Sequence, residues 1–269
     1  GITDITINYK YTQDEIRKMQ NEIDYNTNLI LAKITDDMTE YEIVKLFFDE
    51  IASTCTYKLD SPNCSDIYGC LVNKTAICGG FAKAFSYLCS KVGIESLLIT
   101  GDYDEPHMWN MVNIDNEWYH VDVTAGIVKT NSSRYVRYDY FCVTDDFIKA
   151  WRTVYDQDYM YPSAVYNTYN YYNMNGLTAN SYDDAVRIIT SEIQRATSSK
   201  ETVIQINCVS DEVYETICYN LFTRKTDNAL SLYESAYDNA ENKYVTSTLT
   251  YNTDPQTKVI KLFLVYKNN

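Results

Sequence analysis

The spacing of apolar residues in the middle of the chain predicts a helix that begins at a cysteine. The clearest stripe recurs every three or four positions between residues 78 and 92: Cys78, Phe81, Ala82, Phe85, Leu88, Cys89 and Val92. Such spacing is typical of a helix with one buried face, and Gly93 stands where such a helix ends. Cys78 would then lie in the first turn. Gly79 and Gly80 are poor helix formers, and the close approach of a substrate backbone would explain them.

Two β-prone runs follow, residues 107–114 and 117–123, and they flank the pair Asp115-Asn116. This pair tolerates the left-handed backbone of a two-residue hairpin turn. In that register Asp122 lies opposite Trp109, and His107 is its diagonal neighbour on the same face. Diagonal neighbours have Cα atoms about 7–8 Å apart, so the imidazole and the carboxylate can meet. A three-residue loop would separate them, but the apolar residues share one face only in the two-residue register.

The remaining pattern predicts two parts. Before the hairpin we expect a strand at residues 5–11 and helices at residues 12–32 and 38–55, the first with a capping box of Thr12 and Glu15. After it we expect helices at residues 181–197 and 211–219, a strand at residues 202–209, and a hairpin of residues 244–251 with 258–266. The prediction is a domain at residues 1–160, with the N-terminal strand and helix as an extension, and a small α+β accessory domain at residues 161–269.

The boundary is placed where the composition changes. Seven tyrosines lie between Tyr155 and Tyr172, mixed with Asn and Ser. An edge strand of an ordinary sheet is the first interpretation of this run. A carbohydrate- or peptide-contacting surface is the second, because tyrosine rings offer rigid amphipathic area.

Charge and hydropathy limit the partners. The net charge of −14 argues against nucleic acid or an anionic membrane surface, because both require basic patches. No apolar run approaches the ~20 residues of a membrane span. The start at Gly1 lacks the charged and apolar segments of a signal peptide. Because the chain begins with Gly and not Met, we expect that a preceding segment was removed or truncated. We expect an extracellular or cell-surface protein, with the cytoplasm as the alternative.

The sequence does not decide which of the cysteines, if any, form disulfides. Eight are present, and Cys55, Cys64 and Cys70 lie in one short stretch that could supply a disulfide in an exported protein. The chain has no CxxC pair and two histidines, so we expect no structural zinc. No phosphate-binding glycine loop or calcium loop is present, and we expect no cofactor.

Cys78, His107 and Asp122 together have the chemistry of a nucleophile, a base and an orienting carboxylate. A thiolate is favoured by a helix N-terminus and by a neighbouring imidazole. Each residue alone has an ordinary structural explanation, as a small core residue, a strand-end histidine or a cap. His120 is the competing base, because it falls opposite Met111 on the same face. Its position in the middle of a strand, away from any cleft rim, favours His107.

The residues from Tyr68 to Leu88 around Cys78, then Gly93 to Ser96, His107 to Asn110 and Trp118 to Thr124, resemble the transglutaminase-like superfamily of papain-type thiol folds, in its bacterial branch. The resemblance covers about residues 40–150, and the run that begins Tyr140-Phe-Cys-Val is similar to the segment after the triad. This sequence departs from the family pattern at Gly79, where many members have Glu, and at Ala125, where many members have Trp.

The resemblance implies an α+β fold with a papain/transglutaminase-like core, in which a nucleophile-bearing helix packs on an antiparallel sheet. It also implies catalytic Cys78, His107 and Asp122, with acyl transfer from a peptide or glutamine amide through a thioester. Gly79, Gly80 and Trp109 are the predicted substrate contacts. The substrate is expected to be a protein or peptide, including cell-wall peptide. Transfer to water or to an amine stays open, and a non-catalytic peptide- or wall-binding module is the alternative.

Overall fold

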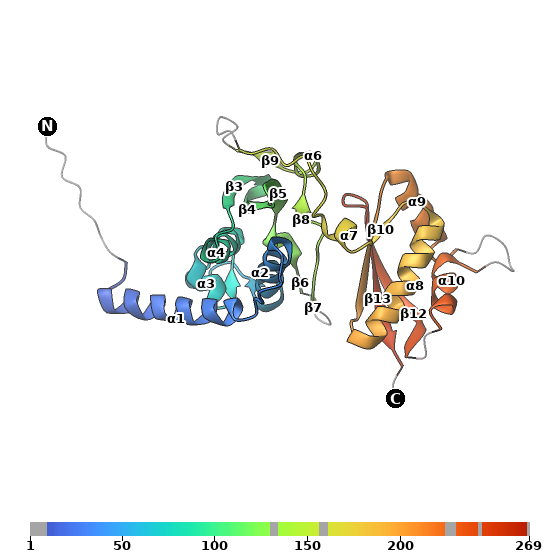
Figure 1. Cartoon of the computed structure of the whole chain (residues 1–269), viewed down its shortest axis with the longest axis horizontal. Coiled ribbons are helices and arrows are strands. Elements are labelled where there is room, and N and C mark those ends of the chain that lie inside the picture. Colours follow the sequence, from blue (N-terminus) through green and yellow to red (C-terminus); the bar gives the residue numbers. More distant parts are fainter. Residues whose placement is uncertain (1–9, 130–133, 156–160, 224–229, 242–243, 268–269) are drawn as a thin grey trace. The chain divides into compact units, whose positions relative to one another are not determined.

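The computed structural model describes the chain except residues 1–9, 130–133, 156–160, 224–229, 242–243 and 268–269. Two compact units are distinguished, Gly1–Asn167 and Thr168–Asn269 (Figure 1). Each combines helices with a mainly antiparallel sheet, which confirms the expected α+β class. The predicted strand at residues 5–11 lies almost entirely outside the described residues, and so does the predicted boundary at residue 160.

Two capped helices open the first unit. Helix α1 spans Gln13–Leu31, and the predicted capping box of Thr12 and Glu15 is present. Helix α2 spans Glu40–Thr54 and begins two residues later than the predicted start, because Thr39 caps it in a second capping box. In such boxes the side chains satisfy backbone N–H groups that have no partner within the helix.

Five strands of the described residues form the sheet of the first unit, in the order β8-β5-β4-β3-β9 and all antiparallel. Their bounds are Phe141–Val143 (β8), Glu117–Val121 (β5), Glu105–Ile114 (β4), Ser96–Tyr103 (β3) and Thr153–Val154 (β9). The β4–β5 hairpin has the predicted register, with Val121 opposite Asn110. Asp115 and Asn116 adopt φ of 51° and 67°, the left-handed turn that this register requires.

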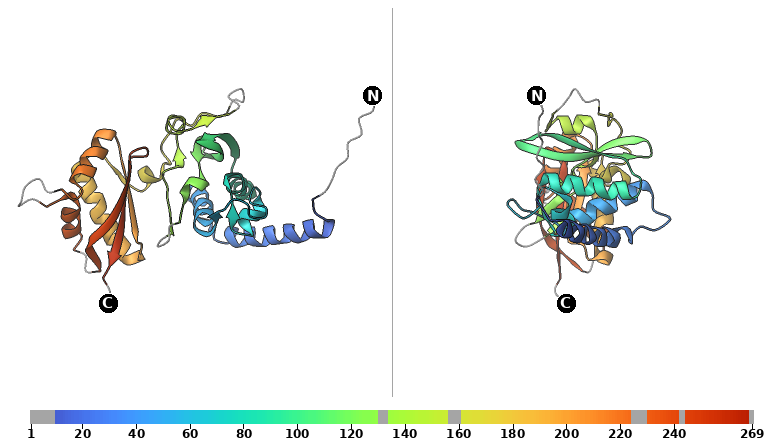
Figure 2. Two further views of the ribbon diagram at one scale, coloured as in Figure 1. Left: turned by 180° about the vertical axis from the view of Figure 1, so that it is seen from behind. Right: turned by 90° about the vertical axis from the view of Figure 1, so that its left-hand side faces the viewer.

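Helix α4, Cys78–Lys91, packs against β3 and β4 of this sheet (Figure 2). The residues that point into the core include Phe81, Phe85 and Leu88, each fully buried. The helix ends at Lys91 with Val92 as its C-cap, and Gly93, predicted to follow the helix end, takes a φ of +78°. The expected helix that begins at Cys78 and packs on an antiparallel sheet is therefore present.

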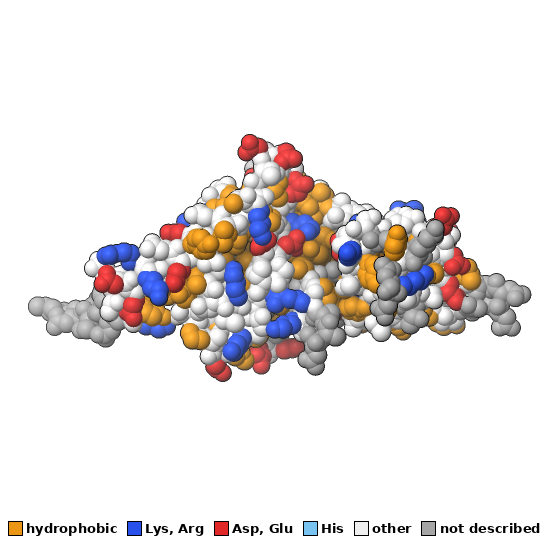
Figure 3. Space-filling model, turned by 90° about the horizontal axis from the view of Figure 1, so that it is seen from below, with side chains coloured by type: hydrophobic (Ala, Val, Ile, Leu, Met, Phe, Trp, Pro, Cys, Tyr) orange, Lys and Arg blue, Asp and Glu red, His pale blue; other side chains and the backbone are white. Residues whose placement is uncertain are grey.

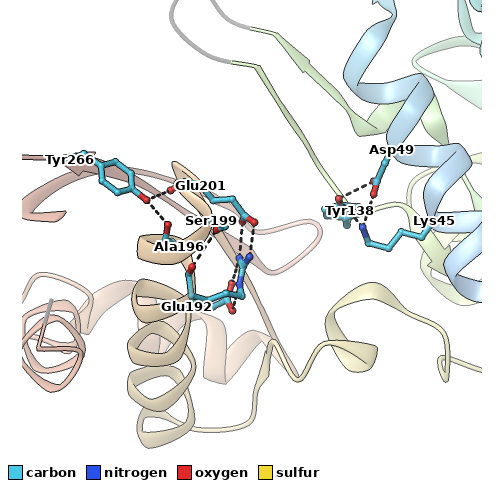
Figure 4. Close-up of polar contacts among 9 residues, drawn as sticks. Lys45, Asp49, Tyr138, Glu192, Ala196, Ser199, Glu201 and Tyr266 are labelled. Atoms are coloured by element: carbon cyan, nitrogen blue, oxygen red, sulfur yellow. Dashed lines mark hydrogen bonds and ion pairs between the residues drawn. The ribbon is translucent and has the colours of Figure 1, made fainter. Parts of the chain in front are cut away.

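Short elements complete the first unit. They are β1 (Thr56–Tyr57), α3 (Ile67–Leu71), β2 (Thr75–Ala76), α5 (Val123–Gly126), β6 (Ile127–Lys129), β7 (Arg134–Val136) and α6 (Asp145–Lys149). Tyr138, between β7 and β8, donates its hydroxyl to Asp49 at 2.9 Å and lies 3.3 Å from the ammonium of Lys45 (Figure 4). This cluster joins the segment that leads into the sheet to α2.

The second unit has one sheet of four described strands, ordered β10-β11-β13-β12. Its elements are α7 (Tyr171–Met174), β10 (Thr178–Ala179), α8 (Tyr182–Ser199), β11 (Val203–Cys208), α9 (Asp211–Asn220), α10 (Leu232–Asn239), β12 (Val245–Asp254) and β13 (Val259–Tyr266). Tyr266 donates to the carbonyls of Ala196 and Glu201, which joins β13 to the end of α8 (Figure 4). Helix α10 was not predicted.

The tyrosine-rich segment differs from its first interpretation. Its described residues form no edge strand between Tyr161 and Asn170. The backbone carbonyl of Ala164 accepts from the N–H of Asp145 at 2.8 Å, and the Ala164 side chain is buried in the core of the first unit. This segment packs on the core without pairing with a strand. The alternation of side chains along the sequence therefore did not predict its irregular conformation.

One face of the molecule is of mixed charge. The face drawn in Figure 3 carries Lys and Arg side chains interspersed with Asp and Glu on both units. None of the helices in the described part of the chain has the length and apolarity that a membrane crossing needs.

Candidate active site

Cys78 is the first residue of α4 and is partly exposed. The residue before it, Ile77, caps the helix through its backbone alone, and its N–H donates to the carbonyl of Cys64 at 2.9 Å. The strand β2 leads into this point and pairs with β1. The loop that contains Cys64 therefore fixes where the helix begins, and the thiol lies at the positive end of the helix dipole.

The two glycines after Cys78 have different surroundings. A Cβ atom at Gly80 would overlap the carbonyl oxygen of Cys64 and lie 2.9 Å from the Cβ of Ala76. The close approach at Gly80 is thus to the chain's own backbone and not to a substrate. At Gly79 the nearest atoms to such a Cβ are 3.9 Å away, although the residue is buried.

His107 and Asp122 meet as the hairpin register predicts. Nε2 of His107 lies 2.8 Å from Oδ2 of Asp122, with the imidazole 14% exposed and the carboxylate 1%. Asp122 also caps α5, where its Oδ1 accepts the N–H of Ala125 at 3.2 Å. The second imidazole nitrogen remains for Cys78, whose pKa is lowered chiefly by His107. The structure therefore brings His107 into contact with Asp122 and into the surroundings of Cys78.

The electrostatics favour a thiolate beside an imidazolium. The hydrogen bond from His107 is the main cause that lowers the pKa of Cys78, with further help from backbone bonds at Met108 and Gly79, against the opposing effect of burial. Burial also opposes the charge on His107, but the hydrogen bonds to Asp122 and Cys78 outweigh it and raise the pKa of His107 to about 9. Each group thus stabilises the charged form of the other.

Arg152 is the residue that the sequence analysis missed. Its Nη2 lies 2.6 Å from Oδ2 of Asp122, and both side chains are 1% exposed. Burial alone would raise the pKa of Asp122, but the charge of Arg152 and the bond from His107 hold it well below its usual range. The guanidinium also lies over the rings of Trp109, at 5.2 Å, and Tyr140, at 4.5 Å. Arg152 follows α6 and has no motif or periodicity that would have singled it out.

His120 is engaged elsewhere. It lies opposite Met111 as predicted, and it is buried. Its Nδ1 is 3.0 Å from the indole Nε1 of Trp109, which can only donate, so Nδ1 accepts. Its Nε2 consequently carries the proton and donates to Oδ1 of Asp145 at 2.9 Å. Burial is the main cause that lowers the pKa of His120. A neutral imidazole with both nitrogens occupied is not available to Cys78.

Trp109 was predicted to contact the substrate, and the structure corrects this interpretation. The ring is 1% exposed and belongs to a core cluster with Ile99 and Met111. It stacks on the imidazole of His107, with ring centres 6.0 Å apart and planes 20° apart. The side chain therefore supports both histidines from within the core.

Tyr57 is an exposed side chain next to the thiol. It is 46% exposed and stacks on Phe81 of α4 with ring centres 6.4 Å apart. The pKa of the Tyr57 hydroxyl is raised, mainly by partial burial and to a smaller extent by the charge of Cys78. Among the described residues no group of three or more His, Cys, Asp or Glu side chains could hold a metal ion.

The comparison with known families agrees with this geometry. Residues 29–123 match the model of the transglutaminase-like superfamily, a segment that includes Cys78, His107 and Asp122. The resemblance to that superfamily is therefore confirmed for this part of the chain, while the assignment to its bacterial branch stays a prediction. A search of curated protein sequences gave no match.

Three solved structures are distantly similar. One described as a TGase has 19% identity and a TM-score of 0.36, over 43% of this chain and 34% of its own. A candidate cysteine protease from Cytophaga hutchinsonii has 16% identity and a TM-score of 0.35, over 58% of this chain and 61% of its own. The structure of menin, which reveals a binding site for the Mixed Lineage Leukemia protein, has 14% identity and a TM-score of 0.31. That match covers 85% of this chain and 52% of menin. The chain thus spans between a third and two thirds of these proteins.

Proposed function

We propose that the chain is a thiol enzyme that attacks amide carbonyls through Cys78. The observation that carries the proposal is the hydrogen bond between His107 and Asp122 at 2.8 Å. The lowered pKa of Cys78, of which His107 is the main cause, supports it. The match to the transglutaminase-like superfamily supports the general kind of activity. In this proposal His107 is the general base and acid, and Asp122 orients its ring and stabilises its charge.

The first half of the reaction forms a thioester. The thiolate of Cys78 adds to the carbonyl carbon of the amide, and the carbonyl oxygen becomes an oxyanion. The backbone N–H of Cys78 is one donor to it, because the first N–H groups of a helix have no acceptor within the helix. The imidazolium of His107 then gives its proton to the leaving nitrogen, the C–N bond breaks, and the amine departs.

The second half transfers the acyl group. Neutral His107 takes a proton from the acceptor, which attacks the thioester, and the thiol of Cys78 is released. A water acceptor makes the protein a peptidase or amidase, and an amine acceptor makes it a cross-linking enzyme. Water exclusion and an amine pocket decide between them. We propose a protein or peptide substrate, in keeping with the superfamily, with cell-wall peptide as one candidate, and an extracellular or cell-surface location.

The decisive experiment measures thiol reactivity and turnover together. At about pH 6 an ordinary cysteine has less than about 1% thiolate, so iodoacetamide should label Cys78 well before the other cysteines. Cys64 and Cys218, which are also partly exposed, are the internal controls. Turnover should be assayed with peptide and glutamine-amide substrates, each with and without an added primary amine.

Two variants separate the possible results. Cys78→Ala should abolish both labelling at this position and turnover, and His107→Ala should slow the labelling. If Cys64 reacts while Cys78 does not, the proposal fails. If Cys78 is reactive and no amide substrate is turned over while peptides bind, the protein is a binding module that keeps the fold.

A further inference from the structure

The thiols of Cys55 and Cys70 are in direct contact. Their sulfur atoms are 3.6 Å apart, and the thiol of Cys55 also donates to the carbonyl of Cys70 at 3.0 Å. The two residues are 1% and 0% exposed. The sulfur atoms of a disulfide are about 2 Å apart, so the pair needs to approach by only about 1.5 Å.

Each cysteine is fixed by the element that holds it. Cys55 caps the C-terminus of α2, and its N–H donates to the carbonyl of Ile51 at 2.9 Å. Cys70 lies in α3, which Asp66 caps by accepting the N–H groups of Tyr68 and Gly69. The two thiols are therefore held face to face by two helix ends.

We propose that Cys55 and Cys70 form a disulfide that braces the loop on which the start of α4 rests. The loop enclosed by the bond contains Cys64, whose carbonyl accepts the N–H of Ile77 and packs against Gly80. The bond would thus restrain the segment that positions Cys78. It does not depend on the reaction proposed at Cys78.

The oxidant is a disulfide compound outside the protein, such as oxidised glutathione. The thiolate of Cys55 attacks it, one glutathione leaves as thiol, and a mixed disulfide remains on Cys55. The thiolate of Cys70 then attacks the sulfur of Cys55 and releases the second glutathione thiol. Two protein thiols and one glutathione disulfide thereby give one protein disulfide and two glutathione thiols. An oxidising compartment, as expected for an exported protein, favours this product.

The two thiols differ in their access to an oxidant. Burial raises the pKa of Cys70, which is fully buried. Cys55 follows Thr54, the exposed last residue of α2, so we take Cys55 as the first nucleophile. Because both sulfur atoms are buried, we expect the bond to form readily during refolding and slowly in the folded chain.

The test is a peptide map of the full chain after refolding in a mixture of reduced and oxidised glutathione. Free thiols are blocked with iodoacetamide, and the protein is digested without reduction. Trypsin separates Cys55, before Lys58, from Cys64 and Cys70, which share the peptide that ends at Lys74. Cleavage at Asp66 then separates Cys64 from Cys70. We expect the crosslinked peptides of Cys55 and Cys70, and carbamidomethyl groups on Cys64.

Thermal unfolding gives the second readout. A disulfide that closes a loop of this length should raise the midpoint by about 5–10 °C over the reduced protein. Cys64→Ala should keep both the crosslink and this gain, and Cys55→Ala should lose both. Repeating the map with Cys78→Ala keeps the reactive thiol out of the exchange.

Two results would overturn the proposal. One is blocked, uncrosslinked Cys55 and Cys70 after oxidative refolding to the folded state, and the other is a crosslink of either residue to Cys64. Wild-type protein in its oxidised and reduced forms suffices for both readouts if Cys55→Ala does not fold. A crosslinked chain without amide turnover would leave the disulfide established and refute only the reaction proposed at Cys78.

Discussion

Arg152 and His107 bind the same oxygen of Asp122, Oδ2, at 2.6 and 2.8 Å. The carboxylate therefore has two cationic neighbours when His107 is protonated, and both Asp122 and Arg152 are buried. Among the described residues neither Nε nor Nη1 of Arg152 has a hydrogen-bond acceptor. The aromatic rings that surround the guanidinium are its other partners, through cation–π contacts. Arg152 is thus a positioning residue for Asp122.

The first prediction concerns this ion pair. Arg152→Met should destabilise the protein by about 3–5 kcal/mol, because removal of one partner leaves the other charge buried. The charge of Arg152 also lowers the pKa of His107, so its loss should move the alkaline limit of turnover upward. Urea unfolding and a pH–rate profile measure the two effects. Arg152→Lys is the matched control, and it should restore part of the stability. An unchanged alkaline limit in a folded Arg152→Met protein would contradict the positioning role.

The two histidines should respond differently to replacement by alanine. His107→Ala should lower turnover by a factor of about 10²–10⁴, because it removes the base and the leaving-group acid. His120→Ala should leave most of the activity of the folded protein and cost stability, since the Trp109 and Asp145 groups lose their buried partner. Turnover and urea unfolding should be measured on both. A comparable loss of activity with little loss of stability in His120→Ala would mean that the assignment of the base is wrong.

The pH dependence follows from the directions of the pKa shifts. Because the pKa of Cys78 is lowered, its alkylation should persist at pH values where a free cysteine is protonated. Because the pKa of His107 is raised to about 9, leaving-group protonation should fail only above about that pH. Turnover should therefore follow a bell-shaped profile between these limits. In His107→Ala the rise of the Cys78 alkylation rate with pH should occur at a higher pH. If this rise stays at the same pH, the imidazole does not stabilise the thiolate.

Gly79 and Gly80 are a matched pair. Gly80→Ala should destabilise the protein by about 1–3 kcal/mol, because its methyl group overlaps the Cys64 carbonyl and backbone must shift. Gly79→Ala meets no atom nearer than 3.9 Å, so it should be neutral or stabilising by up to about 1 kcal/mol through helix propensity. Thermal unfolding distinguishes the signs. Equal destabilisation by the two substitutions would contradict the packing described for the start of α4.

The sequence was informative wherever one local pattern determined the structure. The glycine-flanked start of α4 and the Asp115-Asn116 turn fixed the positions of Cys78, His107 and Asp122. Arg152 was missed because its contact with Asp122 joins two segments that share no periodicity, and a buried arginine after a short helix resembles an exposed one in sequence.

The glycines and the aromatic residues show a second limit of the sequence. Gly80 was interpreted as room for a substrate, and the atom that requires it is the carbonyl of Cys64, which is distant in sequence. Trp109 has the alternation of a strand residue, but its burial depends on how the sheet is covered. Periodicity therefore predicts which face of an element a residue occupies, and long-range packing decides what that face contacts.

The last prediction concerns the extent of the catalytic unit. Cys78, His107, Asp122 and Arg152 all lie within the unit that ends at Asn167. A chain that ends there should fold and keep the labelling of Cys78 by iodoacetamide within about twofold. Turnover of a macromolecular substrate should fall, because the second unit would no longer help to hold it. Turnover of a small peptide should not.

A shorter chain, ending at Tyr155, provides the matched comparison. It lacks Ala164, which is buried in the core and whose carbonyl accepts the N–H of Asp145 at 2.8 Å. Asp145 in turn holds His120, so this shorter chain should unfold at a lower urea concentration than the one that ends at Asn167. Urea unfolding followed by labelling measures both. If the chain ending at Asn167 folds but loses the reactivity of Cys78, residues after Asn167 must complete the site, and the two units would then form one interdependent enzyme.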